Sequence, residues 1–493
     1  MAPRRAALIL TLLAAPLLGA EGPPRARGRV ALAPCRLPGM EGDALCGTLE
    51  VPERRDAPSG RRITLRLAVL TARGPHARPD PVFVVAGGPG QSAVNIAAQV
   101  AQEMEATLAE REVVLVDQRG SGGSNRLECR QFADDDMRRY LSRGFDLDAL
   151  RRCRADLEKR ADLTAYTTDA AVADLEDVRA AMGYERIDLD GGSYGTRVVL
   201  WYLKRHPARV RTAVLRGVSP TDYALPLPFA RAGQDALERL FADCAGERAC
   251  NTAFPGLRDE FAALLERLGR GPVEVDVKNP VTGAVQKAVI DREIFVTRVH
   301  LLLFSSRLST RLPALLHQAA AGEWAPFAQL AADFGRAIVE QIDLGLQLSV
   351  ACAEDAPRLR AADIDAATRG TFLGRGRVDQ LLAACAVWPA APTPAGFYDP
   401  VRSDVPALVV SGELDPVTPP RFGAQVARGL RHGWHAVIAN GSHVDGGPCV
   451  DGLVTAFVRA GSADGLRPDC FGLGVRPPFV LPDPAPSAAS PTP

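Results

Sequence analysis

Two apolar segments, 81–86 and 112–117, and an alternating segment, 63–69, predict strands in the first half of the chain. The segment 168–182 instead repeats its apolar residues at helical spacing and is followed by a glycine. Strands that are apolar throughout belong to parallel sheets covered by helices on both faces. We therefore expect an α/β domain built on a mostly parallel sheet.

The alternation of strands and helices stops after the first part of the chain. Residues 223–400 are mostly helical in pattern, apart from a polar hairpin-like pair at 273–277 and 288–290. Apolar strands return at 405–411 and 434–439. We interpret the middle segment as a mainly helical cap domain inserted into the sheet domain.

The predicted sheet domain comprises residues 21–222 and 401–475, on either side of the cap at 223–400. The mature length exceeds what one hydrophobic core usually holds, which also favours two lobes. The last segment, 476–493, is rich in Pro, Ala and Ser. Because it has too little apolar content to fold, we expect a disordered tail.

Residues 1–20 are typical of a secretory signal peptide. They begin with the basic Arg4 and Arg5, continue with an apolar stretch and end in small residues. The apolar stretch is shorter than the about 20 residues that cross a bilayer. We expect a bacterial protein that is exported, secreted or periplasmic, and free of the membrane once the signal is removed.

Ten cysteines fall into five local pairs. In an exported chain such pairs favour disulfides, and none has the C-x-x-C spacing of zinc ligands. Pairing in sequence order is the simplest connectivity, although others are possible. The pairs in that order are Cys35–Cys46, Cys129–Cys153, Cys244–Cys250, Cys352–Cys385 and Cys449–Cys470.

The net charge is zero, with 58 Lys and Arg residues against 58 Asp and Glu residues. A chain without a basic field has no electrostatic attraction for nucleic acid or an acidic membrane surface. The sequence implies no metal and no organic cofactor, and it leaves the oligomeric state open. Any chemistry is therefore expected from side chains alone.

A serine between glycines, Ser193, follows the short apolar run 186–190 and precedes a helix-like segment. Strand, sharp turn and helix form the setting of a nucleophile elbow, where the positions two residues before and after the serine must be small. Here they are Gly191 and Gly195. The spacing alone is weak, because a Gly-rich turn after any buried strand also produces it. We predict that Ser193 is a nucleophile.

Two residues that follow later strands complete a serine-hydrolase triad. Asp415 comes after the strand at 405–411, and His443 comes after the last strand. The carboxyl ends of parallel strands meet at one edge, so both are expected near Ser193. His443 would take the serine proton, and Asp415 would orient the imidazole. The alternatives are loop packing for His443 and Glu413 in place of Asp415.

The oxyanion formed on attack needs backbone N–H donors, and those of Tyr194 and Gly88, with Gly87 less favoured, suit this role. Asp190, inside the elbow strand, must be ion-paired or have a raised pKa, and the sequence does not decide between these states. Histidines on helical stretches, His300 among them, are expected at the surface or at helix ends.

Together these segments resemble the proline iminopeptidase and tripeptidyl aminopeptidase (TAP-like) branch of the α/β-hydrolases. The resemblance spans residues 80–450 and implies an α/β-hydrolase fold with an inserted helical cap. It also implies release of residues from a peptide's free N-terminus. Ala86 and Asp190 depart from the family pattern and leave the preferred substrate open. The matching segments are GGPGQS at 87–92, DQRGSGGS at 117–124, DLEDVR at 174–179, GGSYGT at 191–196, CAVWP at 385–389, GELDPVTP at 412–419 and NGSH at 440–443.

By the same resemblance, Glu354 and Asp355 match an acidic segment of the cap. A carboxylate there would bind the protonated α-amine of the substrate; the alternative is a solvated or salt-bridged pair. We predict an exported serine aminopeptidase that acts on peptides with a free N-terminus. The alternatives are an esterase or amidase for small acyl substrates and a non-catalytic binding protein that has kept the fold.

Overall fold

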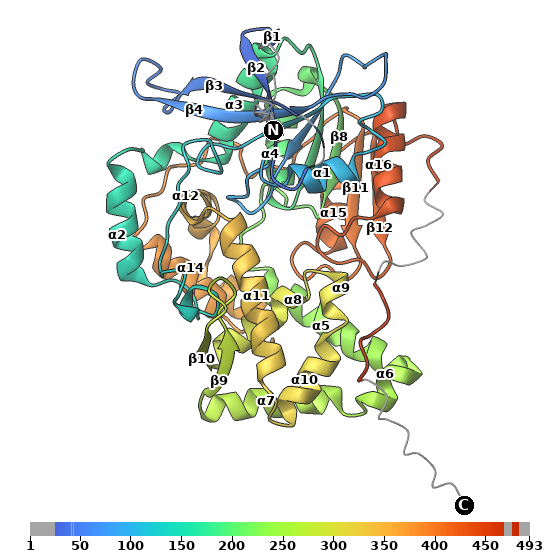
Figure 1. Ribbon diagram of the computed structural model, residues 1–493. Coiled ribbons are helices and arrows are strands. Elements are labelled where there is room, and N and C mark those ends of the chain that lie inside the picture. Colours follow the sequence, from blue (N-terminus) through green and yellow to red (C-terminus); the bar gives the residue numbers. More distant parts are fainter. Residues whose placement is uncertain (1–24, 41, 43, 468–475, 483–493) are drawn as a thin grey trace, which may run out of the picture.

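A computed structural model describes residues 25–40, 42, 44–467 and 476–482 of the protein. The predicted signal peptide lies outside these residues, as does most of the predicted tail. Figure 1 shows a twisted sheet with flanking helices in the upper half and a lobe of helices in the lower half. The expected α/β architecture is therefore confirmed.

Within the described residues, ten strands form one sheet in the order β1-β2-β3-β4-β6-β5-β7-β8-β11-β12. Neighbouring strands from β6 to β12 are parallel to one another, and β1 to β4 form an antiparallel extension in which β4 pairs with β6. The parallel strands therefore end at a common edge. Their bounds are β1 Arg25–Arg27, β2 Val30–Cys35, β3 Ala44–Pro52, β4 Arg62–Leu70, β5 Val82–Val85, β6 Val113–Val116, β7 Ile187–Gly192, β8 Val210–Arg216, β11 Ala407–Gly412 and β12 Gly433–Ile438.

Helices cover both faces of the sheet, which is why β5 and β6 are buried at every position. One face packs against α3, α4 and α15, and the other packs against α1 and α16. The helix α4 is buried from Tyr194 to Leu203, so it forms the centre of its layer. The bounds are α1 Ala97–Glu103, α2 Leu147–Glu158, α3 Thr168–Ala181, α4 Tyr194–Arg205, α15 Pro420–Ala427 and α16 Pro448–Ala460.

The lobe lies between β8 and β11 and has an aromatic core of its own, with Phe241, Phe261, Phe295 and Phe327 buried in it. Two of its helices, α12 and α14, pack instead with α3 and α4 and so join the lobe to the sheet domain. The predicted cap limits, 223 and 400, fall in connecting segments. The elements are α5 Phe229–Gly246, α6 Arg248–Ala253, α7 Leu257–Arg270, β9 Val273–Lys278, β10 Val285–Ile290, α8 Arg292–Leu302, α9 Ser306–Ser309, α10 Leu312–Ala320, α11 Ala325–Gln341, α12 Leu344–Glu354, α13 Ala361–Thr368 and α14 Gly376–Cys385.

Four disulfides connect the cysteines in sequence order, as expected from their spacing. The fifth predicted pair includes Cys470, which lies outside the described residues. None of the helices in the described part of the chain is both long and apolar enough to cross a membrane.

Candidate active site

The backbone turns sharply between β7 and α4, at Ser193. Its φ of 55° and ψ of −124° lie in a region that costs energy for any residue with a Cβ. The two flanking glycines make the turn possible. A Cβ on Gly195 would lie 2.1 Å from the carbonyl oxygen of Val85, and one on Gly191 would lie 2.7 Å from that of Gly195. The helix can therefore start directly beside β5 only because both positions lack a side chain.

Three side chains from separate strand ends meet at this turn. The Oγ of Ser193 lies 2.9 Å from Nε2 of His443, and Nδ1 of His443 lies 2.9 Å from Oδ2 of Asp415. The serine follows β7, the aspartate follows β11 and the histidine follows β12. The parallel strands thus bring together groups that are 250 positions apart in the chain.

The carboxylate of Asp415 is fully engaged. Its Oδ1 accepts the N–H groups of Val417 and Thr418, each at 2.8 Å, and its Oδ2 accepts the Thr418 hydroxyl at 2.8 Å. Burial alone would raise the pKa of Asp415, but His443 and these hydrogen bonds lower it below its usual value. An ionised Asp415 holds the proton of His443 on Nδ1, which leaves Nε2 free to accept the serine proton.

The histidine loop is also bound to the helical lobe. The backbone N–H of His443 donates to the carbonyl oxygen of Phe304 at 3.1 Å, and the two aromatic rings lie 5.5 Å apart. The neighbouring Ser442 hydroxyl donates to the carbonyl oxygen of Leu303. The position of the imidazole therefore depends on the segment that follows α8 in the lobe.

A small cavity of about 20 Å³ lies against Ser193, Tyr194 and Gly88. This is room for about one water-sized group. The N–H of Tyr194 opens the first turn of α4, where no intrahelical acceptor is available. At Gly88, φ is +107°, a conformation that other residues rarely adopt. The space beside these residues suits a single oxygen atom.

A much larger cavity of about 900 Å³ lies between the sheet and the lobe and reaches the serine. Such a volume is typical of sites that enclose an organic ligand. Apolar side chains from the lobe cover the catalytic edge of the sheet. The residues that line it next to Ser193 and His443 include Gly88, Leu225, Phe229, Phe304 and Val417.

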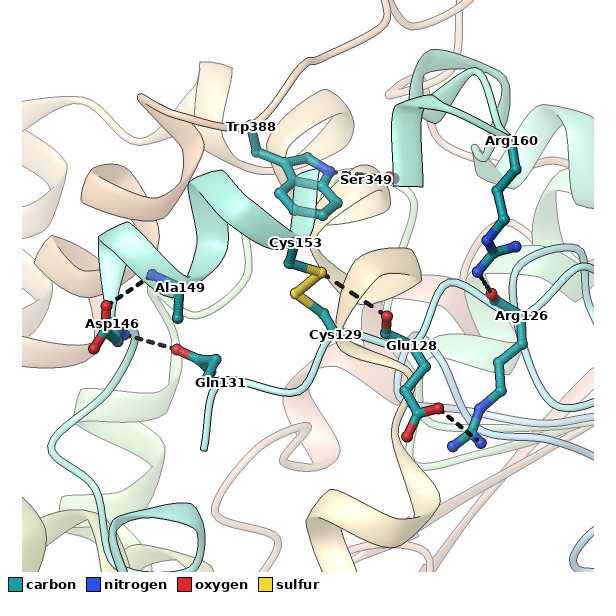
Figure 2. Close-up of a disulfide and its surroundings, with 10 residues drawn as sticks. All are labelled: Arg126, Glu128, Cys129, Gln131, Asp146, Ala149, Cys153, Arg160, Ser349 and Trp388. Carbon is teal, nitrogen blue, oxygen red and sulfur yellow. Dashed lines mark hydrogen bonds and ion pairs between the residues drawn. A yellow bond between two sulfur atoms is a disulfide. The ribbon is translucent and has the colours of Figure 1, made fainter. Parts of the chain in front are cut away.

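The disulfide Cys129–Cys153 fixes one wall of this cavity (Figure 2). Cys129 belongs to the segment after β6 and Cys153 belongs to α2, with their Cα atoms 5.7 Å apart. In the same segment, Arg126 and Glu128 line the cavity and form an ion pair of 3.4 Å. The disulfide thus anchors the cavity wall to a helix.

Two family models match the chain. The first, described as the alpha/beta hydrolase fold, covers residues 80–252, and the second, described as TAP-like protein, covers residues 371–470. The chain has an α/β-hydrolase fold with a TAP-like C-terminal part. The first match contains Ser193 and the second contains Asp415 and His443, so the two matched segments supply the groups that meet in the site.

Several curated proteins are similar to this hydrolase. The serine protease Hip1 of Mycobacterium tuberculosis is 28% identical over 481 residues, which cover 87% of this chain and 88% of Hip1. Carboxylesterase B of Mycobacterium tuberculosis is 27% identical over 455 residues, covering 85% of each chain. A proline iminopeptidase of Xylella fastidiosa is 36% identical over 99 residues, which cover 20% of this chain and 30% of that protein.

The acidic pair of the hydrolase, Glu354 and Asp355, is buried around Arg197. Glu354 accepts the N–H and the hydroxyl of Thr168, each at 2.7 Å, and lies 3.3 Å from the guanidinium. Asp355 lies 2.9 Å from the same guanidinium and accepts the N–H of Leu225. Glu354 does not line the large cavity, whereas Asp355 reaches the small one. This geometry favours the salt-bridged alternative over binding of a substrate amine.

Asp190 is both ion-paired and shifted in pKa. Its two oxygens accept hydrogen bonds from Arg216 at 3.0 and 2.5 Å, and Arg216 also pairs with Glu103 at 3.0 Å. Burial raises the pKa of Asp190, and the charge of Arg216 opposes that rise. The sequence analysis missed Arg216, whose partner lies on the adjacent strand and cannot be found from spacing.

Two other expectations have clear outcomes. Glu413 pairs with Arg239 at 3.1 Å and accepts the N–H of Asn440 at 2.9 Å, whereas the carboxylate that contacts the imidazole of His443 is that of Asp415. His300 lies in the last turn of α8, as one of the two expected settings, but its side chain is completely buried in the lobe and not at the surface. Burial and the nearby charge of Arg377 lower the pKa of His300 to about 3. Its Nε2 lies 3.1 Å from the carbonyl oxygen of Pro416, next to the aspartate loop.

Proposed function

We propose that this protein is an exported serine peptidase that releases residues or short peptides from a free N-terminus. The observation that carries the proposal is the unbroken contact from Ser193 through His443 to Asp415, at the floor of a cavity that reaches into the lobe. The names of Hip1 and of proline iminopeptidase support peptide bonds as the target. The four disulfides support export to an oxidising compartment, where such bonds persist.

In the proposed mechanism, Ser193 attacks the carbonyl carbon of the scissile bond as His443 accepts its proton. Asp415 keeps the imidazole oriented and stabilises its charged form. The N–H groups of Tyr194 and Gly88 stabilise the oxyanion, each such donor being worth about 3 kcal/mol. His443 then protonates the leaving amine, and water attacks the acyl-enzyme by the same steps in reverse.

A catalytic edge covered by a lobe favours the end of a peptide over the middle of a long chain. This supports an aminopeptidase over an endopeptidase. Binding of the α-amine by Glu354 and Asp355 stays a prediction, and the ion pair with Arg197 argues for a structural role. The name of carboxylesterase B keeps an esterase as the second candidate.

The test uses tripeptidyl and aminoacyl nitroanilides, their N-acetylated forms and p-nitrophenyl acetate. We expect cleavage of the free-amine peptides and a loss of at least tenfold in kcat/KM on acetylation. Replacing Ser193 by Ala should reduce kcat by about 10⁴-fold or more and abolish labelling by a fluorophosphonate. Hydrolysis of the ester without any peptide cleavage would establish the esterase instead. Peptide cleavage that survives Ser193→Ala would contradict the mechanism.

A further inference from the structure

Arginines are frequent in the wall of the large cavity, and most of them are neutralised. Five lie within 4 Å of a carboxylate oxygen of the protein. The remaining two, Arg298 of α8 and Arg377 of α14, form no ion pair with any residue that the structure describes. The five paired side chains are Arg126, Arg130, Arg139, Arg143 and Arg216.

The side chain of Arg298 is almost completely buried, with 9% of the residue exposed. One of its terminal nitrogens donates to the carbonyl oxygen of Tyr140 at 2.5 Å, and its Nε is buried without a hydrogen-bond partner. A buried charge that lacks both a counter-ion and a full set of hydrogen bonds is unfavourable. An external anion that completed these contacts would remove this penalty.

The second guanidinium, that of Arg377, lies over the ring of Phe229 at 5.3 Å. Burial lowers the pKa of Arg298 to about 10, and the charge of Arg377 adds to this effect. Burial likewise lowers the pKa of Arg377 to about 10. Both groups still carry a positive charge at neutral pH, so the cavity wall holds two unbalanced like charges.

Aromatic rings connect these charges to the catalytic base. The ring of Phe229 lies 5.4 Å from that of His300, which lies 5.1 Å from Phe304, and Phe304 lies 5.5 Å from His443. Of these rings, those of Phe229, Phe304 and His443 line the cavity, whereas His300 lies buried behind them. A substrate held at Ser193 can extend along this wall, and each extended residue spans about 3.5 Å. The two arginines therefore lie within reach of a peptide a few residues long.

We propose that Arg298 and Arg377 bind a carboxylate of the peptide and so give this hydrolase a preference for substrates with a negative charge remote from the scissile bond. The planar guanidinium donates two parallel hydrogen bonds to a carboxylate, which makes it selective for this group. The carboxylate belongs either to an acidic side chain of the substrate or to the C-terminus of a short peptide. The inference rests on the proposed peptidase activity at Ser193.

The experiment compares matched peptides with wild-type protein. One pair differs by Glu against Gln in the segment N-terminal to the cut, and a second pair differs by a free C-terminal carboxylate against an amide. We expect at least a tenfold higher kcat/KM for the charged member of one pair, which identifies the source of the carboxylate. Equal rates within both pairs would overturn the proposal, whatever the variants do.

The variants Arg298→Met and Arg377→Met should each raise KM for the charged peptides and so remove most of the preference for them. Hydrolysis of the neutral peptides should change less than twofold. Arg377→Lys should restore part of the preference, and Arg143→Gln, in the same wall but paired with Asp291, should leave it intact. A loss that is equal for charged and neutral peptides would show a structural role and overturn the proposal.

Thermal unfolding separates these roles further. Because the charge of Arg377 is unbalanced without substrate, Arg377→Met should unfold at the same Tm as the wild type or higher, whereas Arg298→Met also loses the hydrogen bond to the carbonyl of Tyr140. Glutarate should raise the Tm of the wild type and leave that of the variants unchanged. Peptide cleavage without charge preference would reject only the role of the arginines, whereas absence of any peptide cleavage would reject the proposed function itself.

Discussion

The ion pairs around Arg197 place two carboxylates against one guanidinium, with all three side chains buried. Burial raises the pKa of Glu354 to about 7, although Arg197 and the hydrogen bonds from Thr168 oppose the rise. In the unfolded chain the pKa of the same carboxyl is about 4.3. Between these two values the folded protein binds a proton that the unfolded chain releases.

Because the folded state binds this extra proton, the contribution of Glu354 makes the protein more stable at low pH than at high pH. Stability from Glu354 is complete below about pH 4.3 and is lost as the pH rises through about 7. Between pH 4.5 and pH 8 the loss amounts to about 3 kcal/mol. Glu354→Gln should remove this pH dependence. The difference in unfolding free energy between the variant and the wild type should therefore change by about 3 kcal/mol from pH 4.5 to pH 8. Urea unfolding at a series of pH values measures the difference, and parallel curves would contradict it.

The same variant also distinguishes the two roles considered for Glu354. If its carboxylate supports the site through Thr168 and Arg197, kcat/KM for peptides and for acetate esters should fall by a similar factor. An increase in KM confined to peptides with a free amine would instead assign amine binding to Glu354. Glu105→Gln, at an exposed ion pair with Arg73, serves as the control and should change neither quantity.

The positions of Ser193, Asp415 and His443 were predictable because each follows an apolar strand in a recognisable turn. The ion pair of Asp190 with Arg216 was not, since it depends on the register in which β7 and β8 lie side by side. Nor could the sequence indicate that Arg298 and Arg377 face a cavity, because charged residues on helices usually point to solvent.

At the scale of elements, the junction of β7 and α4 depends on Gly195. We expect Gly195→Ala to destabilise the fold by about 2–3 kcal/mol, because the new methyl group would lie 2.1 Å from a backbone oxygen of β5. The resulting shift of α4 should also move Ser193 and reduce kcat by at least tenfold. Urea unfolding and steady-state kinetics measure the two effects.

Gly246 provides the matched control for this substitution. It ends α5 in the lobe, and an added Cβ would meet nothing within 4 Å. Alanine favours a helix over glycine by about 1 kcal/mol, so Gly246→Ala should leave stability unchanged or increase it. If both alanine variants behaved alike, close packing at the elbow would not explain its glycines.

Strands and helices with strong patterns were predicted correctly, whereas β1, β2 and β3 were missed. Their antiparallel pairing leaves many positions partly exposed, and β3 shows intermediate burial at most of its residues. A half-exposed strand of mixed composition carries neither the apolar run of β5 nor the clear alternation of β4. Its conformation is fixed by its pairing with β2 on one side and β4 on the other.

At the scale of the molecule, the disulfide Cys129–Cys153 couples the cavity wall to α2 (Figure 2). It closes a loop of 24 residues, for which chain entropy predicts a stabilisation of about 3 kcal/mol. We expect replacement of both cysteines by Ser to lower the unfolding free energy by this amount. KM for peptides should rise as the wall loosens, while acetate esters should be hydrolysed as before.

Removal of Cys35–Cys46 tests whether the effect on KM is specific. This disulfide joins β2 and β3 at the far side of the sheet and closes a shorter loop of 11 residues. Its loss should reduce stability less and leave KM for peptides unchanged. Similar KM values in the two double variants would mean that the wall segment does not contact the substrate.

The proposed nucleophile and its base are positioned by different parts of the protein, the sheet domain and the helical lobe. Ser193 directly follows β7 of the sheet. The backbone N–H of His443 donates to the carbonyl oxygen of Phe304, which follows α8 in the lobe. A displacement of the lobe away from the sheet would pull on the loop of His443 and would separate the imidazole from the Ser193 hydroxyl. In the proposed enzyme the triad is therefore complete only while the lobe lies against the sheet, and a peptide that met an open form would not be cleaved.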